Sequence, residues 1–124
     1  MEILHKKKLA FEKIELSKSK IKSDETATIT VNVKNFKEKV DDISVLVKTD
    51  DASNQYLTID KPSIRLPSLV FPNGNTGNQE ITINPYNIPL HKMEFKISVE
   101  VYTDNGKKLM LKKDLDLTVN KKKM

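Results

Sequence analysis

The chain has 124 residues, with 22 Lys and Arg against 17 Asp and Glu and a formal net charge of +5 at pH 7. Its 37% of hydrophobic residues can fill one core, which excludes a wholly disordered chain, and its longest apolar runs are three residues, too short to cross a bilayer. We expect a single domain over residues 1–124, with basic tails at 1–8 and 120–124.

The chain has no cysteine, which excludes disulfides, thiolate metal sites and cysteine nucleophiles. Its first four residues, Met1 to Leu4, precede the basic residues, the reverse of the order in a secretory signal. If Met1 is the natural start, we expect a cytoplasmic protein. The alternative is an extracellular module cut from a longer surface protein.

Residues 2–16 are the one region where a helix competes with a strand, because Glu, Leu, Lys and Ala are good helix formers. We expect a strand, since Leu9 and Phe11 alternate with polar residues, as do Ile14 and Leu16, with one phase slip between the two pairs.

Strict alternation continues along the chain. Ala27, Ile29, Val31 and Val33 fall on one face with polar residues between them, and Ile43 to Val47 repeats the pattern, which is typical of half-buried strands. Shorter alternating segments end near prolines, around 57–59, 64–66 and 81–83. The interpretation of residues 52–72 is open, because one strand or two could form there.

The C-terminal part predicts a long hairpin. Five apolar residues from Met93 to Val101 alternate with polar ones, Asn105-Gly106 suits a type I′ turn, and alternation resumes from Leu109 to Val119. Lys113 falls on the apolar side of the second strand. We therefore expect it to mark a bulge, a sheet edge or a lysine that extends its ammonium into water.

Short strands at this spacing, with no convincing long helix, predict an all-β, immunoglobulin-like antiparallel sandwich of seven or eight strands. The stretch from Ser23 to Asn35 resembles the second strand of CARDB-type (cell-adhesion-related) immunoglobulin-like domains of bacterial and archaeal proteins. The loop from Pro72 to Asn78 and the hairpin from Met93 to Val119 are similar as well, although Phe36 stands where a glycine usually follows the asparagine. The resemblance implies a spacer or binding module and carries over no functional residue.

The sequence offers little for catalysis. His5 and His91 each have a lysine beside them and lack metal-ligand spacing, so we expect solvated histidines, no cofactor and no enzyme. The carboxylate pairs Asp41-Asp42 and Asp50-Asp51 could contribute to a Ca²⁺ site, but solvated charges at strand ends are the favoured interpretation.

Lysines gather at one predicted pole of the sandwich. In a seven-stranded arrangement the start of the first strand shares a pole with the loop after the second strand and with the final hairpin turn. The candidate polyanion-binding residues there are Lys6, Lys7, Lys8, Lys37, Lys39, Lys107 and Lys108. Because Arg65 is the only arginine and acids lie among these lysines, nucleic-acid binding is an alternative and a solvated surface is favoured.

A polar loop is the other candidate site. Asn73, Asn75, Thr76 and Asn78 could recognise a ligand, although a connecting turn is favoured, and Tyr56, Tyr86 and Tyr102 could stack on a sugar. The function we expect is a non-catalytic interaction or structural module that presents loops and sheet edges to another protein, with no membrane insertion. The sequence does not fix the oligomeric state.

Overall fold

The computed structural model describes residues 9–35, 42–49, 56–66, 74–89, 91–103 and 106–122. Within these ranges the chain is all strand and connection, and it includes no helix that could span a membrane. The strands are β1 (Leu9–Leu16), β2 (Lys20–Lys22), β3 (Ala27–Asn35), β4 (Ser44–Thr49), β5 (Leu57–Ile59), β6 (Ser63–Arg65), β7 (Gln79–Pro85), β8 (Lys92–Thr103) and β9 (Lys108–Asn120).

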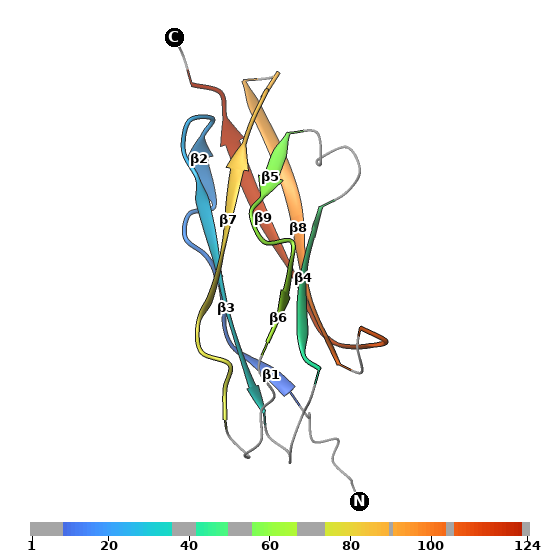
Figure 1. Cartoon of the computed structure of the whole chain (residues 1–124). Helices are drawn as coiled ribbons and strands as arrows, with labels where there is room; N and C mark the ends of the chain where they lie inside the picture. Colours follow the sequence, from blue (N-terminus) through green and yellow to red (C-terminus); the bar gives the residue numbers. More distant parts are fainter. Residues whose placement is uncertain are drawn as a thin grey trace, which may run out of the picture.

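The strands form two sheets that face each other (Figure 1). One sheet has the order β1-β3-β7-β5 and the other the order β2-β9-β8-β4-β6. The alternating residues expected to face inward do so, since those of β3, from Ala27 to Val33, and Ile97, Val99 and Val101 on β8 are fully buried. The predicted β-sandwich is confirmed, and its core is the layer of aliphatic side chains between the sheets.

Residues 9–22 contribute a strand to each of the two sheets. β1 pairs with β3, and β2 then joins the other sheet by pairing in parallel with β9. The predicted strand is confirmed for Leu9–Leu16, and the phase slip in its sequence corresponds to a β-bulge between Phe11 and Lys13. The bulge allows apolar residues on both sides of it to face the core despite their broken alternation.

Residues 57–66 repeat this arrangement at the opposite side of the sandwich. β5 pairs with β7 in one sheet, and β6 pairs with β4 in the other. For the described part of residues 52–72, the open question is thus answered by two short strands. β5 and β6 run in the same direction, as do β1 and β2, so the nine strands of the described residues make seven passes, and the start of β1 and the end of β9 lie at opposite ends of the sandwich (Figure 1).

The predicted C-terminal hairpin is confirmed. β8 and β9 pair along almost their whole length, from Lys92 opposite Asn120 to Thr103 opposite Lys108, with one bulge between Val101 and Tyr102. Gly106 has a φ of 85°, a conformation that favours glycine. The expected turn type involves Asn105, which lies outside the described residues.

Candidate functional site at the open edge of strand β9

Among the described residues, β2 covers a short part of the outer edge of β9. β2 pairs with Thr118–Asn120, and the Thr118 N–H donates to the Ser19 carbonyl oxygen at 2.8 Å. Because backbone groups alternate between the two sides of a strand, the N–H and C=O groups of Lys112, Asp114 and Asp116 point to the same outer side as those of Thr118. Within the described parts of the chain, no strand pairs with that side of Lys108–Leu117.

β1 is the edge of the facing sheet on the same side of the molecule, and it lies close to β9. Its edge differs from that of β9, because the bulge at Phe11 and Lys13 interrupts it. The register of β9 against β8 is regular from Leu111 to Asn120. A regular, unpaired stretch is a better template for another strand than a bulged one.

The inward side chains of this stretch are mainly apolar. Leu111 and Leu115 are partly buried against the core, Leu117 is fully buried, and Lys113 between them is exposed. Of the three expectations for Lys113, the sheet edge is confirmed, and the bulge lies elsewhere, at Met110 of β9. Partly buried side chains of β1, among them Phe11, pack against the same core across the gap between the sheets.

The opposite face of β8 carries a carboxylate held by two neighbours. Lys48 Nζ lies 2.8 Å from Glu100 Oε1, and the Tyr102 hydroxyl donates to the same oxygen at 2.7 Å. The hydrogen bond from Lys48 is the main cause that holds the pKa of Glu100 below its usual value, and the bond from Tyr102 is the second. The same Lys48–Glu100 hydrogen bond raises the pKa of Lys48. Glu100 is only 8% exposed and stays ionised and paired, which is the behaviour of a structural ion pair.

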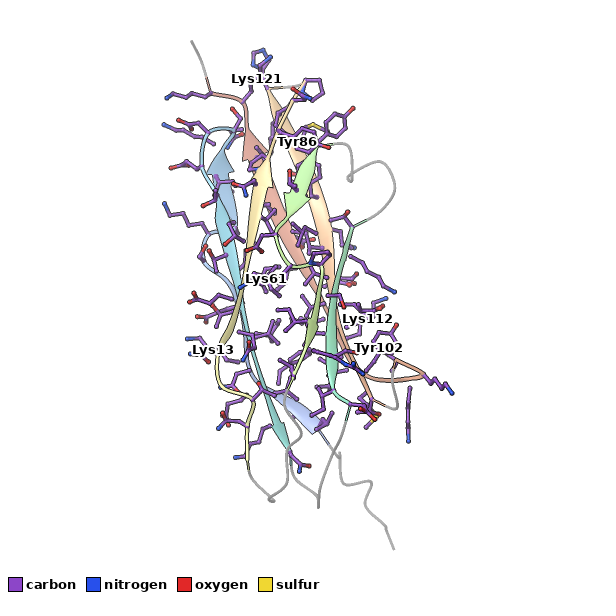
Figure 2. All side chains as sticks on the ribbon, in the orientation of Figure 1. Lys13, Lys61, Tyr86, Tyr102, Lys112 and Lys121 are labelled. Atoms are coloured by element: carbon purple, nitrogen blue, oxygen red, sulfur yellow. The ribbon has the colours of Figure 1, made fainter. Side chains whose placement is uncertain are left out.

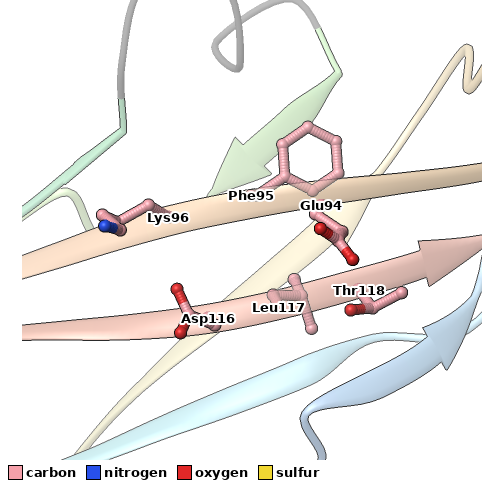
Figure 3. A pocket seen from close by; sticks show the side chains of 6 residues that line it. All are labelled: Glu94, Phe95, Lys96, Asp116, Leu117 and Thr118. Atoms are coloured by element: carbon pink, nitrogen blue, oxygen red, sulfur yellow. The ribbon is translucent and has the colours of Figure 1, made fainter.

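Charges alternate in sign across this face. Lys96 on β8 lies opposite Asp116 on β9, and both line a shallow hollow of about 410 Å³ with Glu94 and Thr118 (Figure 3). Its polar lining consists of two carboxylates, one lysine and one threonine. In the part of the chain that the structure describes, no group of three or more His, Asp or Glu side chains could hold a metal ion.

The predicted ligand loop is fastened to β3 over its described part. Thr76 is 8% exposed, its Oγ1 accepts a hydrogen bond from the Val33 N–H at 3.0 Å, and its own N–H donates to the Val33 carbonyl oxygen. Thr76 therefore anchors the loop. Asn75 and Asn78 are exposed, and Asn78 accepts a bond from the Asn32 amide at 3.1 Å, while Asn73 lies outside the described residues.

Most of the predicted lysine pole lies outside the described residues, namely Lys6, Lys7, Lys8, Lys37 and Lys39. Lys107 and Lys108 are exposed beside the β8–β9 turn. The carboxylates considered for calcium are also outside, except Asp42, which is exposed with a φ of 57°.

The three tyrosines do not converge. Tyr86 donates its backbone N–H to the Tyr56 carbonyl oxygen at 2.9 Å, so these two residues are neighbours. Tyr102 lies toward the other end of the sandwich, as does Lys112, whereas Tyr86 lies near the end that carries Lys121 (Figure 2). A single sugar could not stack on all three.

The sequence signal for the open edge was Lys113, a charge on the apolar side of a strand. What the sequence did not predict is the extent of the edge, because nothing in the pattern showed that, among the described residues, only Lys20–Lys22 would pair with the outer side of β9.

No family model matches the chain, and no curated protein matches it. Among solved structures, the periplasmic chaperone SfaE aligns with 90% of the chain at 11% identity and a TM-score of 0.55. The chain has an immunoglobulin-like fold. The aligned part spans 58% of the SfaE chain. The ASH / PapD-like domain 7 of human CEP192 aligns over 100% of this chain and 92% of its own at 13% identity, with a TM-score of 0.49. Domains 4 and 5 of the S-layer protein SbsC align over 91% and 53% at 13% identity, with a TM-score of 0.41.

The open edge predicts an alternating pattern of amide hydrogen exchange along β9. The outward N–H groups of Lys112, Asp114 and Asp116 should exchange rapidly, because no strand in the described part of the chain pairs with them. Those of Lys113 and Leu115, bonded to β8, should exchange slowly. Residue-resolved exchange followed by NMR measures this, with Thr118 as the protected control. Equal protection of Asp114 and Leu115 would contradict the open edge.

The Glu100 cluster predicts a stability difference that depends on pH. Glu100→Gln should lower the free energy of unfolding by about 1–2 kcal/mol at pH 7. Because the folded pKa of Glu100 lies below its ordinary value of 4.5, its stabilisation is complete above that pH and is lost as the pH falls through the folded pKa.

Urea denaturation of both proteins at pH 7 and pH 3 measures this difference. The exposed carboxylate of Glu94, on the same strand, provides the control, since Glu94→Gln should change stability by no more than about 0.5 kcal/mol. A Glu100→Gln effect of the same size at both pH values would show that the carboxylate charge does not stabilise the fold.

Proposed function

We propose that this chain is a non-catalytic interaction module that binds an extended segment of another protein as an added strand along the open edge of β9. The observation that carries the proposal is the row of outward backbone groups at Lys112, Asp114 and Asp116, with which no other described strand pairs. Main-chain hydrogen bonds to such a row supply affinity, and side chains at alternate positions supply specificity.

Leu111 and Leu115 give the added strand an apolar surface. Both are only partly buried, so a strand placed beside β9 would remove more of their area from water. The near edge β1, with Phe11 and Ile14 also partly buried, borders the same space. Apolar side chains of the partner would therefore pack between the edges of the two sheets.

The similarity to SfaE supports the fold, and the edge geometry supports the mode of binding. SfaE is a periplasmic chaperone, which agrees with a protein partner for this chain but does not identify one. The CARDB-type assignment remains part of the proposal. It is consistent with β3, which ends at a fully buried Asn35 whose N–H donates to the Gly74 carbonyl oxygen at 2.8 Å.

Selection from a display library of random nine-residue peptides tests this function. We expect the wild-type protein to enrich peptides that bind Asp116→Asn about equally, because that variant keeps the backbone N–H. Asp116→Pro removes the outward N–H, and binding should weaken about tenfold, which corresponds to about 1.4 kcal/mol. Proline is tolerated at an edge position whose N–H faces solvent, so thermal unfolding should show both variants folded.

Two outcomes would contradict the proposal. One is that the wild-type protein enriches no peptide above a blank surface. The other is that every selected peptide binds Asp116→Pro as tightly as the wild-type protein, which would place binding away from the β9 edge.

A further inference from the structure

Lys113 interrupts the apolar row on the inward side of β9. Its Cα partner on β8, Val99, is fully buried, and Leu111 and Leu115 on either side pack partly against the core. Lys113 itself is exposed, and no acidic side chain in the described part of the chain forms an ion pair with it. An inward charge on an edge strand discourages pairing with an arbitrary strand.

A second copy of the chain is a poor occupant of this edge. When β9 pairs antiparallel with its own copy about a twofold axis, the central residue lies opposite itself. The middle of the open stretch is Lys112, Lys113 and Asp114, so each of these registers sets like charges directly opposite each other. A register centred on Leu115 sets Asp114 against Asp116 of the other copy, twice.

A segment of different sequence can pair with this edge in either the parallel or the antiparallel direction. The residue opposite Lys113 and the residues two positions away on each side would share one face of the added strand. The flanking two would lie opposite Leu111 and Leu115, where apolar side chains are favoured. Cross-strand neighbours have Cβ atoms about 4.5–5.5 Å apart, so the central side chain would reach the Lys113 ammonium.

We propose that the partner segment carries an acidic residue opposite Lys113 and an apolar residue two positions away on each side. This inference rests on the strand addition proposed above and names its partner class. An added strand would cover the stem of Lys113 and remove part of the water around its ammonium, so a carboxylate opposite is favoured and a cation is disfavoured. Partner side chains opposite Lys112 and Asp114 would stay in water, because both residues are exposed, so their charge would change the affinity less.

Two synthetic peptides, capped at both ends, test this inference on the full chain. Each has a central residue flanked at two positions on either side by leucine, with threonines between, and the centre is aspartate in one and lysine in the other. The wild-type protein should bind the aspartate peptide about tenfold more tightly, and Lys113→Glu should reverse the preference. Lys112→Glu, a control with the same charge change on the opposite face, should keep the wild-type preference.

The outcomes separate this inference from the proposed function. If both peptides bind the wild-type protein equally and neither binds Asp116→Pro, the charge inference is wrong and strand addition stands. If neither peptide binds while display selection yields edge binders, the inference is again wrong. If selection yields none either, strand addition fails with it. If Lys112→Glu reverses the preference for the aspartate peptide as fully as Lys113→Glu does, the preference comes from overall charge, and the role of Lys113 is overturned.

Self-association gives a second, independent measurement. In Lys113→Leu, the register centred on residue 113 would pair Leu111 with Leu115 and Lys112 with Asp114 of the other copy. We therefore expect this variant to dimerise in analytical ultracentrifugation, and Lys112→Leu to sediment as the wild-type protein does. A wild-type dimer that Asp116→Pro dissociates, or a Lys113→Leu variant that sediments as the wild type, would show that Lys113 does not keep a second copy off this edge.

Discussion

Strand β9 needs hydrogen-bond partners on both sides, and the fold supplies them unequally. One side of its thirteen residues pairs along β8, while the other is covered by β2 over Thr118–Asn120. Unpaired backbone groups at a sheet edge are the usual template for adding another strand. This uneven pairing makes the outer side of β9 the candidate binding surface. It also means that Lys113 can affect which strand pairs there, whereas in a central strand both sides would already be paired.

The rest of the sandwich limits its edges by sharing segments between the sheets. Residues 9–22 supply β1 and β2, and residues 57–66 supply β5 and β6, so each side of the molecule is bordered by one segment that changes sheet. A chain of this size can therefore border two sheets without dedicated edge strands for each. As a result, the strands within each shared segment are short, and β2 does not extend along β9 beyond Thr118–Asn120.

Charge on this protein is organised in pairs across strands. Lys48 holds Glu100, Lys96 lies opposite Asp116, and Ser98 donates to Asp114 at 2.7 Å on the same face. The net charge of +5 is thus not a uniform basic surface over the described sheets. Lys113 differs from these residues in facing inward at an edge without an ion-pair partner in the described part of the chain.

The sequence by itself determined which residues face the core, because side-chain parity along a strand is a local property. It therefore predicted the sandwich, the long hairpin and the phase slip that corresponds to the bulge between Phe11 and Lys13, and it left a sheet edge as one of three alternatives for Lys113. Only the tertiary structure decided that residues 57–66 change sheet, that the Thr76 hydroxyl bonds to β3 and that β2 covers three residues of β9. These features depend on which distant strand lies alongside, and the local alternation of a sequence does not encode that pairing.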